Sequence, residues 1–462
     1  VTNITQDTYH VTIQSAIDSS VNGDTIIVSS GTYTENIIID GKDIVLASDF
    51  LLTNDTSYIS STIIDGNQSG RVIKAYSSTA CLTRFGCLDE SDYTVAIIGF
   101  TIQNGKTSIS DPDGGGVYGD NILLKNNFIK DNICSNQPSF SSAIQNGAGV
   151  YMNGSMMVDC DITNNAFDNN NFNNGGGISS AGGSVILNSR IYGNLALPNG
   201  YDYSPIYGGG IYSSGSFIKG CEIYNSEAKH GGAINGINDS IVNCHIYNNE
   251  SGSGHLAYHR YNDTSYIINS LIELVDNTQQ NVLIWLRGTG SVMNIYNSTI
   301  NGRPSSSSNI SACVNTIRFN NPHTLNFTNN ILVGSINLQD LNARLHLKNS
   351  YVTYGFGEDI DPFCTIANFN PGYSNWNNIS PFISYYSGSP AGFVTFENLI
   401  NGSYLTDPLF VDTANGDYSL SNFSPCIGAG LDTSIVPTYD LDGNPRPNPA
   451  GSNPDMGAYE NA

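Results

Sequence analysis

The sequence predicts an all-β protein, a right-handed parallel β-helix in which short strands wind into a solenoid of stacked coils. A unit recurs: Gly208-Gly209-Gly210-Ile211 leads into Cys221-Glu222-Ile223-Tyr224, and Gly231-Gly232-Ala233-Ile234 leads into Cys244-His245-Ile246-Tyr247. The copies are offset by about 23 residues, which is too long for a hairpin and suits one coil of three strands. Charged residues make up only 12% of the chain, and no long amphipathic helix is visible, so the repeat decides the fold class.

Each copy ends in a turn unit, Asn-x-x-aliphatic, that can be followed through the chain. Its first residues are Asn126, Asp159, Asn188, Asn243, Asn269, Asn297, Asn329 and Asn349. Steps of about 20 to about 33 residues predict a coil near 22 residues with loops of up to about ten residues at its corners. We expect the Asn side chains to hydrogen-bond from coil to coil as a stacked amide ladder.

A glycine corner precedes the turn unit in several of the copies. It occurs as Gly114-Gly115-Gly116, Gly147-Ala148-Gly149, Gly175-Gly176-Gly177 and Gly208-Gly209-Gly210. Glycine permits the positive φ of a sharp corner and lets neighbouring backbones approach closely. The pattern predicts one such corner at the start of a strand in every coil.

The repeat predicts one elongated domain, because a solenoid grows in one dimension. Residues 1–50 form an N-terminal cap and the first coils, 95–352 the regular coils, 353–400 an irregular aromatic-rich insertion, and 401–462 the C-terminal coils and cap. Ile13, Ala16 and Ile17 share one helical face. We expect a short helix there to close the open end of the solenoid.

The nine cysteines are an odd number, so at least one is unpaired. Cys160, Cys221 and Cys244 occupy the position that serine holds in other copies, which predicts small buried side chains inside the coils. The spacing of Cys81 and Cys87 permits a loop disulfide without requiring one. No Cys-x-x-Cys pair occurs, and a structural zinc site has little support.

The net charge of −23, with a pI near 4.3, argues against nucleic acid or an anionic membrane as a partner. The same charge repels an anionic polysaccharide unless a local basic patch or a bound cation intervenes. No apolar run approaches the length of a membrane span, so we expect no transmembrane segment.

Both ends of the chain resemble a known family. The opening motifs are Gly23-Asp24-Thr25-Ile26, Gly31-Thr32-Tyr33, Ile63-Ile64-Asp65-Gly66 and Gly99-Phe100-Thr101-Ile102. They resemble secreted bacterial proteins of the pectin-lyase-like superfamily. The closing motifs are Asp407-Pro408-Leu409-Phe410, Gly428-Ala429-Gly430, Asp440-Leu441-Asp442-Gly443-Asn444-Pro445-Arg446 and Asp455-Met456-Gly457-Ala458-Tyr459-Glu460. They are similar to those of the choice-of-anchor Q domain family. The resemblance implies a parallel β-helix in an extracellular or cell-surface setting, and it selects no activity.

The insertion at 353–400 offers two kinds of ligand group. Tyr373 and Trp376 are suited to stacking on sugar rings, although such aromatic side chains also pack on the flank of a solenoid. Glu358, Asp359 and Asp361 supply oxygen ligands of the kind calcium prefers, although three acids in a turn are more often solvated. Calcium is the one cofactor for which the sequence offers a candidate site.

Basic residues, scarce elsewhere, gather in three successive coils. The group comprises Lys229, His230, His245, His255, His259, Arg260 and Arg287, with Tyr258 and Trp285 among them. Counting back about 13 residues from the turn-unit aliphatics places His259 and Arg287 at one register, so we expect them to be neighbours. An alternative interpretation is structural, with Lys229 and His230 leading into a glycine corner and the others forming a polar loop.

This cluster suits β-elimination of a uronate-containing glycan. Arg287 neutralises the carboxylate, His259 or Lys229 takes the proton, and Tyr258 or His255 protonates the leaving oxygen. Arg260, Trp285 and His230, with Tyr373 and Trp376, are the candidate substrate-binding residues. The sequence therefore favours an extracellular polysaccharide lyase.

Two other functions stay open. A non-catalytic adhesin or glycan-binding solenoid needs no catalytic group. A glycoside hydrolase needs paired carboxylates, and Asp161, Asp202 and Glu222 are conceivable, but no spacing selects a pair. The expected partner in each case is a polysaccharide or cell-surface glycan.

Overall fold

The computed structural model describes most of the chain. The described residues are 1–77, 88–107, 111–135, 144–168, 173–196, 206–251, 254, 256–258, 263–273, 283–286, 290–302, 317–319, 323–333, 336–338, 344–353, 383–385, 393–397 and 408–461. Within these ranges the backbone is described without the side chains at 257–258, 318–319, 336–338, 352–353, 383–385 and 393–397. They divide into two compact units, 1–236 with 249–251 and 237–248 with 252–462. The expectation of a single domain stays a prediction.

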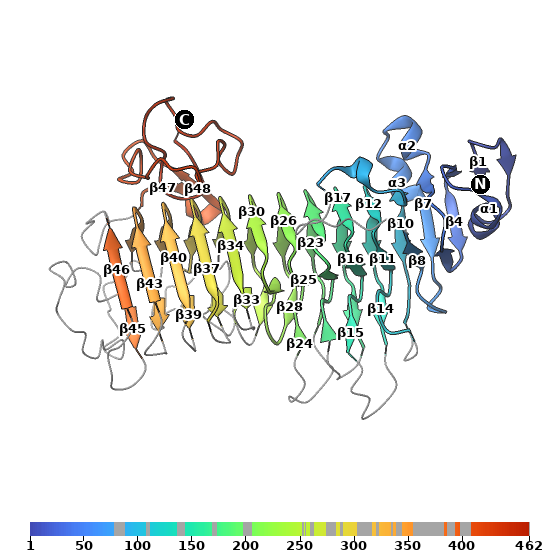
Figure 1. Cartoon of the computed structure of the whole chain (residues 1–462), viewed down its shortest axis with the longest axis horizontal. Coiled ribbons are helices and arrows are strands. Elements are labelled where there is room, and N and C mark those ends of the chain that lie inside the picture. The colour runs from blue at the N-terminus through green and yellow to red at the C-terminus, as the bar shows by residue number, and fades with distance from the viewer. Residues whose placement is uncertain are drawn as a thin grey trace. The chain divides into compact units, whose positions relative to one another are not determined.

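The chain folds as the predicted parallel β-helix, and the first unit contains three long sheets (Figure 1). Sheet A comprises β3 (Thr25–Val28), β6 (Val45–Ser48), β9 (Ala96–Ile98), β12 (Leu123–Lys125), β17 (Met156–Val158), β22 (Val185–Leu187) and β26 (Phe217–Lys219). Sheet B comprises β4 (Gly31–Thr34), β7 (Thr62–Asp65), β10 (Thr101–Gln103), β13 (Phe128–Lys130), β18 (Asp161–Thr163), β23 (Arg190–Tyr192) and β27 (Glu222–Tyr224). Sheet C comprises β5 (Ile37–Ile39), β8 (Ile73–Tyr76), β11 (Val117–Asp120), β16 (Val150–Asn153), β21 (Ile178–Ala181), β25 (Ile211–Ser213) and β29 (Ile234–Gly236).

Shorter strands complete the first unit. The N-terminal pair β1 (Thr2–Asn3) and β2 (Thr8–Tyr9) is antiparallel, and β1 also pairs with β3. Small parallel sheets lie between sheets B and C along the chain: β14 (Ile133–Cys134) with β19 (Ala166–Phe167), β15 (Gln145–Asn146) with β20 (Asn173–Asn174) and β24 (Ile206–Tyr207), and β28 (Glu227–Ala228) with β32 (Glu250–Ser251).

The second unit repeats the three-sheet pattern, in sheets that we name A′, B′ and C′. Sheet A′ comprises β30 (Ser240–Val242), β34 (Thr264–Ile268), β37 (Val292–Tyr296), β40 (Thr324–Thr328), β43 (Arg344–Lys348) and β46 (Phe393–Glu397). Sheet B′ comprises β31 (His245–Tyr247), β35 (Leu271–Glu273), β38 (Thr299–Asn301), β41 (Ile331–Val333) and β44 (Tyr351–Thr353). Sheet C′ comprises β33 (Leu256–Tyr258), β36 (Ile284–Leu286), β39 (Ile317–Phe319), β42 (Ile336–Leu338) and β45 (Ile383–Tyr385).

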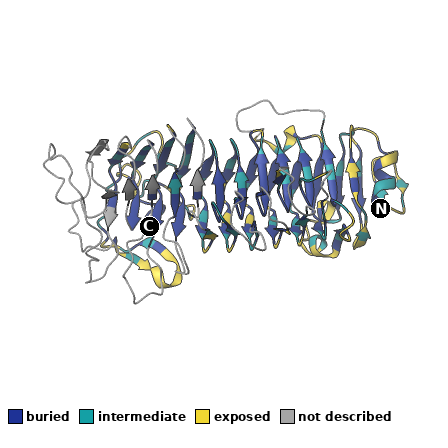
Figure 2. Cartoon of the chain, turned by 90° about the horizontal axis from the view of Figure 1, so that it is seen from below, coloured by how far each residue is buried: buried dark blue, intermediate teal, exposed yellow. Residues whose placement is uncertain are grey.

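The core of each unit is a set of apolar columns inside the coils (Figure 2). In sheet A the inward column is in parallel register and fully buried: Ile26, Leu46, Ile97, Leu124, Met157, Ile186 and Ile218. Sheet A′ stacks Ile241, Ile267, Ile295, Phe327 and Leu347 in the same way. Side chains along a strand point alternately inward and outward, so each strand directs an apolar side chain into the interior. Equivalent side chains of successive coils stack on one another and fill the interior.

The turn units connect sheet A to sheet B in each coil of the first unit, and sheet A′ to sheet B′ in the second. Their first residues adopt positive φ, as at Asn126 (53°) and Asn188 (48°), a conformation that Asn tolerates better than most residues. The next residue points inward, and Cys160, Cys221 and Cys244 are buried free thiols there. The Cys244 backbone N–H donates to Ser270 Oγ at 3.1 Å. The predicted stacking of Cys and Ser at one inward position is confirmed.

Most of the stacked amide ladder lies outside the turn units in which the sequence predicts it. Asn269 Nδ2 donates to Asn243 Oδ1 at 2.9 Å, as the turn unit predicts. A longer run occurs one turn further along the coil, where Asn132 Nδ2 donates to Asn165 Oδ1 at 3.0 Å and Asn165 Nδ2 to Asn194 Oδ1 at 3.1 Å. All three amides of this run are buried, and satisfying them in a row removes the cost of burying polar groups.

The glycine corners have the predicted geometry. Gly114, Gly147, Gly175 and Gly208 have φ between 63° and 77°. A Cβ on Gly147 would lie 2.0 Å from the Val150 carbonyl oxygen. Both the backbone angle and the close approach therefore require glycine here.

Helices lie near the N-terminus, beside the first coils. Helix α1 (Ile13–Ser19) forms where the sequence predicts one, with a Thr12 capping box and with Ile13, Ala16 and Ile17 buried. Its closing of the solenoid end stays a prediction. Helices α2 (Phe50–Thr53) and α3 (Ser57–Ser61), with the 3₁₀ turn η1 (Glu90–Asp92), accompany the first coils. Phe50, Tyr58 and Ile59 pack with Ile27 and Ala47 over the outer side of sheet A.

Residues 408–461, the C-terminal segment, pack on the outer face of sheet B′. They contain the antiparallel pair β47 (Phe410–Asp412) and β48 (Asp417–Leu420) around the 3₁₀ turn η4 (Thr413–Asn415), followed by turns. Leu420, Cys426 and Met456 pack against Ile331 and Val333. The expected C-terminal coils are thus represented, among the described residues, by a segment that adds no strand to the parallel sheets.

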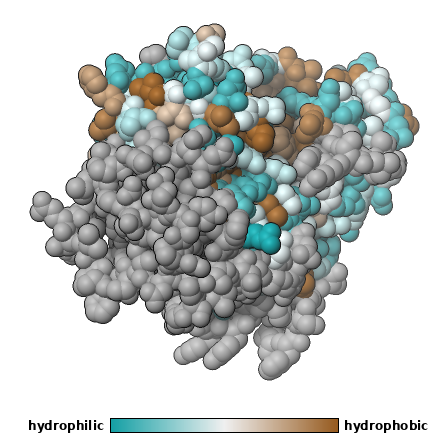
Figure 3. Space-filling model, turned by 60° about the vertical axis from the view of Figure 1, so that its left-hand side comes forward, coloured by the Kyte–Doolittle hydropathy of each residue, from teal (hydrophilic) through white to brown (hydrophobic). Residues whose placement is uncertain are grey.

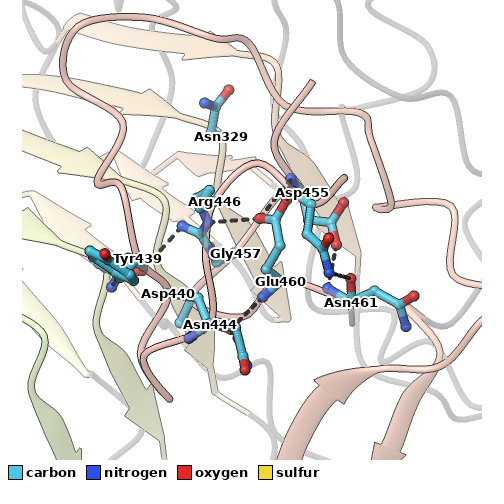
Figure 4. A network of polar contacts seen from close by, with 12 residues as sticks. Asn329, Tyr439, Asp440, Asn444, Arg446, Asp455, Gly457, Glu460 and Asn461 are labelled. Carbon is cyan, nitrogen blue, oxygen red and sulfur yellow. Dashed lines mark hydrogen bonds and ion pairs between the residues drawn. The ribbon is translucent and has the colours of Figure 1, made fainter. Parts of the chain in front are cut away.

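Two turn-unit asparagines bind this segment by hydrogen bonds, and within the segment Arg446 and Glu460 point toward one another (Figure 4). Asn329 exchanges two hydrogen bonds with the Leu431 backbone, at 2.8 and 2.7 Å. Asn269 Oδ1 accepts from Arg446 Nη1 at 3.1 Å, and Arg446 Nε lies 2.8 Å from Glu460 Oε2 with both side chains fully buried. The turn positions thus supply polar partners to a segment more than a hundred residues away in the sequence.

Hydrophilic and hydrophobic residues alternate over the described surface that Figure 3 presents. The large exposed apolar side chains among the described residues are scattered, with Tyr9, Val11 and Phe423 the most exposed. Isolated apolar side chains of this kind are normal on a protein surface.

Candidate functional site

The outer face of sheet C in the first unit carries rows of side chains in parallel register. One row runs Lys74, Tyr118, Tyr151, Ser179, Tyr212 and Asn235. A second row runs Tyr76, Asp120, Asn153 and Ala181. Because successive coils are about 4.8 Å apart, residues of one row are close neighbours although about 30 residues separate them in sequence.

Three tyrosines of these rows are in ring contact, one pair stacked and the other tilted. The ring centroids of Tyr118 and Tyr151 lie 4.9 Å apart with an interplanar angle of 27°, and those of Tyr76 and Tyr118 lie 5.5 Å apart at 54°. All three side chains are partly exposed. We call Tyr76, Tyr118 and Tyr151 the tyrosine strip.

Two cations border the strip. The buried Arg71 guanidinium binds both Asp111 carboxylate oxygens, at 2.9 and 2.8 Å, and lies 4.9 Å from the Tyr118 ring centroid. Lys74 Nζ lies 3.9 Å from Asp111, 5.4 Å from the Tyr76 ring and 5.7 Å from the Tyr118 ring. Cations over aromatic faces are attracted by the ring quadrupole, so Arg71 and Lys74 hold the strip in place.

Two further carboxylates lie beside the strip. Asp113 Oδ1 accepts from the Asn146 backbone and side chain, both at 3.0 Å, and Asp120 Oδ1 accepts from Asn153 Nδ2 at 3.1 Å. Burial raises the pKa of Asp113. Burial, followed by the neighbouring Tyr151, raises the pKa of Tyr118 to about 12. The tyrosine hydroxyl therefore stays protonated at neutral pH and serves as a hydrogen-bond donor.

A second aromatic group lies further along the same unit. The ring of Tyr207 lies 6.2 Å from that of Tyr212 and 5.4 Å from that of His230. Ser179, which is buried, stands between Tyr151 and Tyr212 in the first row. The face thus presents two aromatic groups separated by one coil with a small side chain.

The predicted site residues fall in different places. Lys229 and His230 precede Gly231, whose φ is 68°, in agreement with the alternative that they lead into a corner. Trp285 lies in β36, partly exposed, and Tyr258 in β33 pairs in register with Leu286. His255, His259, Arg260, Arg287, Tyr373 and Trp376 lie outside the described residues. Their proposed clustering stays a prediction.

His245 is held by a partner that the sequence did not indicate. Its Nε2 lies 2.7 Å from Glu273 Oε1, on the next strand of sheet B′, and its ring centroid lies 4.4 Å from that of Tyr247. Glu273 is buried and His245 partly exposed. The pair lies on a different sheet from Tyr258 and Trp285.

The carboxylates considered for glycoside hydrolysis lie on sheet B. Asp161 binds Arg190 through both oxygens, at 2.7 and 2.5 Å, and Arg190 is in register with Glu222. An arginine that occupies both oxygens of Asp161 leaves this carboxylate poorly placed to act as a base. Asp202 lies outside the described residues.

The described residues offer neither a metal site nor a membrane-spanning helix. Glu358, Asp359 and Asp361, the candidate calcium ligands, lie outside the described residues, as do Cys81 and Cys87. The described part of the chain contains no group of three or more His, Cys, Asp or Glu side chains arranged to hold a metal ion. Within that part, no helix has both the length and the apolar character needed to cross a bilayer.

The position of a tyrosine after a glycine corner is a sequence signal for the outward row of sheet C. Tyr118, Tyr151 and Tyr212 each follow the aliphatic residue after a glycine corner, at Val117, Val150 and Ile211. Since that aliphatic side chain is buried, the next residue must point outward. The glycine corner therefore identifies the outward row of sheet C directly from sequence.

Comparisons with known proteins give matches among solved structures alone. No protein-family model matches the chain, and no curated protein sequence matches it. Among solved structures, the pectate lyase Pel9A matches with 15% identity and a TM-score of 0.34, over 97% of this chain and 91% of that one. The PL6 family polysaccharide lyase Pedsa3628 from Pseudopedobacter saltans matches with 12% identity and a TM-score of 0.35, over 91% and 96%. A pectin methylesterase from Aspergillus niger matches with 12% identity and a TM-score of 0.24, over 93% and 91%.

Proposed function

We propose that this protein is an extracellular polysaccharide-active β-helix that binds a glycan chain on the outer face of sheet C in the first unit. The observation that carries the proposal is the tyrosine strip, three partly exposed rings in contact on successive coils, of which Tyr118 and Tyr151 are stacked. Sugar rings present C–H faces that pack well on aromatic rings. Because the coils repeat at about the length of one sugar residue, a glycan that runs across them meets aromatic surface repeatedly.

Polar groups beside the strip supply orientation. Asp120 and Asn153 lie in the row next to Tyr118 and Tyr151. A few fixed hydrogen-bonding groups beside an apolar surface are typical of ligand sites, where they select among hydroxyl arrangements. The face therefore combines a stacking surface with acceptors for sugar hydroxyl groups.

The binding proposal is tested by replacing Tyr118 with alanine. We expect the affinity for a responsive glycan to fall about tenfold or more, which corresponds to about 1.4 kcal/mol, the scale of one lost aromatic contact. The matched control is Tyr192→Ala, because Tyr192 and Tyr224 stack with centroids 5.0 Å apart on sheet B. Equal losses in both variants, or none in either, would contradict the proposed face.

The reaction that we propose is β-elimination, with residues of the second unit in the roles that the sequence assigns. Arg287 neutralises the uronate carboxylate, His259 accepts the proton, and Tyr258 or His255 protonates the leaving oxygen as the C–O bond breaks. The register of sheet C′, with Tyr258 beside Leu286, supports the count that places Arg287 and His259 together. Arg287→Ala is expected to lower turnover about 100-fold or more with an unchanged melting temperature. Full activity in both Arg287→Ala and His259→Ala on a responsive substrate would exclude these roles.

A substrate screen separates the remaining functions. Purified protein is incubated with polyuronates and neutral glycans, and the products are followed by the absorbance of unsaturated sugars and by reducing ends. Unsaturated products indicate a lyase, and reducing ends alone indicate a hydrolase. Retained glycan affinity without either product indicates an adhesin or binding module.

A further inference from the structure

The charges on the outer face of sheet C bear on which glycan binds there. Around the tyrosine strip, the described residues place two cations, Arg71 and Lys74, against three carboxylates, Asp111, Asp113 and Asp120. The face therefore has no excess of positive charge, and its formal balance is negative.

Arg71 is also fully engaged within the protein. Its two Nη atoms bind Asp111, and its Nε donates to the backbone oxygens of Asp113 and Gly114 at 2.8 and 3.0 Å. To bind a ligand carboxylate it would have to give up these partners, and it is buried. Lys74, partly exposed, already lies near Asp111.

The chain segments of the first unit that the structure leaves out do not alter this balance. In sequence they are 78–87, 108–110, 136–143, 169–172 and 197–205. Their ionisable side chains of fixed charge are one cation, Arg84, and one carboxylate, Asp202. These two formal charges cancel, so the summed formal charge of the face and these segments stays negative.

We propose that the glycan segment bound on this face is uncharged, an inference that rests on the binding function proposed above. For the proposed β-elimination to hold as well, the same glycan must carry uronate sugars in addition to the neutral segment that binds here. A polyuronate carries one carboxylate per sugar, so two or three sugars over the strip bring two or three negative charges close to Asp113 and Asp120. Charges that lie closer together than the Debye length, about 8 Å at physiological salt, repel one another with incomplete screening. A neutral glycan meets the same rings and donates hydroxyl hydrogen bonds to these carboxylates at no electrostatic cost.

The test compares polymers that differ only in charge. Polygalacturonate and alginate are each paired with their carboxyl-reduced form, which keeps linkage and stereochemistry, and a panel of neutral plant and microbial glycans is added. Binding to the intact protein is measured by affinity electrophoresis and calorimetry, with a chelator and again with calcium. We expect the tightest ligand to be neutral, to bind with little dependence on salt, and to lose affinity in Tyr118→Ala. We expect its charged counterpart to bind at least tenfold more weakly.

The carboxylate variant Asp120→Asn adds a second measurement. It is expected to raise affinity for the charged polymer several-fold, while Asp131→Asn, the same charge change at a residue outside sheet C, leaves that affinity unchanged. A polyuronate that binds as tightly as its reduced form, with or without calcium, and that Tyr118→Ala weakens, would overturn this inference and keep the binding function. If no glycan in the panel shows Tyr118-dependent binding, the binding function fails, and the inference fails with it.

Discussion

Replacing Arg446 with methionine removes the cation from a fully buried ion pair. Arg446 Nε lies 2.8 Å from Glu460 Oε2, with neither side chain exposed to solvent. The guanidinium also donates to Asn269 Oδ1 and to the Gly457 carbonyl oxygen, both at 3.1 Å. Methionine has a similar length and fills much of the same space, so the substitution removes charge and hydrogen bonds more than volume.

The expected loss is about 3–5 kcal/mol, because the partner carboxylate is left buried without a counter-charge. Glu460 still accepts from the Asn448 and Asp455 backbone N–H groups, at 3.0 and 3.1 Å. These bonds limit the loss but do not replace the cation. Because each 1.4 kcal/mol is a tenfold change in an equilibrium, local opening of the C-terminal segment should become about 100-fold more frequent or more.

Native-state hydrogen exchange measures this opening directly. Solenoids do not in general unfold in one step, so the readout is the protection of individual amides in the segment, such as Leu431 N–H, which donates to Asn329 Oδ1. The matched control is Arg344→Met, since Arg344 is exposed at the start of β43 in the same unit. The double variant Arg446→Met with Glu460→Leu should recover part of the loss by removing the stranded charge. A change below about 1 kcal/mol in Arg446→Met would refute the assigned role of the pair.

Three further predictions concern burial. First, burial raises the pKa of Asp455 and of Glu460 above their ordinary 3.8 and 4.5; these two groups therefore contribute stability to the C-terminal segment that is present below those ordinary values and is lost as pH rises through the raised pKa values. Hydrogen exchange, corrected for its intrinsic pH dependence, should show protection that falls as pH rises above 4.5, and the opposite trend would contradict this. Second, Cys160, Cys221 and Cys244 should resist thiol reagents until the protein unfolds, since burial raises the pKa of Cys160 to about 12; Cys244→Ser should cost about 1 kcal/mol. Third, Ile246→Asp should prevent folding of its coil, because Ile246 is fully buried and the new charge has no partner; a soluble variant with wild-type circular dichroism and melting temperature would show otherwise.

The fold was predictable because the same short sequence features recur from coil to coil. A glycine corner, an outward residue after a buried aliphatic, and an Asn that tolerates positive φ recur from coil to coil, as at Gly147, Tyr151 and Asn188. Local signals of this kind agree with one another and with the stacking that they produce. The repeat therefore fixed the class of fold, although it placed most of the amide ladder one turn too early.

The candidate site was less predictable, since it depends on register between distant residues. Arg71 binds Asp111, which lies forty positions later in the chain and just before a glycine corner. The length of the chain between these two residues does not follow from the repeat. His245 illustrates the same limit, because its partner Glu273 lies one coil away. The scarce basic residues cluster in the middle of the sequence, whereas the described aromatic surface lies along an outward row of sheet C.

The three faces of the coils differ in what already covers them, and this difference supports the choice of sheet C. In the first unit, Phe50, Tyr58 and Ile59 cover apolar residues on the outer side of sheet A. In the second unit, the C-terminal segment covers the outer face of sheet B′, where Ile331 and Tyr351 are buried against it. Covered faces of this kind contribute stability. The outward rows of sheet C instead leave three tyrosine rings partly exposed beside carboxylates. Sheet B of the first unit also leaves two stacked rings partly exposed, Tyr192 and Tyr224, but Asp161 on that sheet is bound by Arg190 through both oxygens. The longer row of rings on sheet C is better explained by a ligand that stacks there.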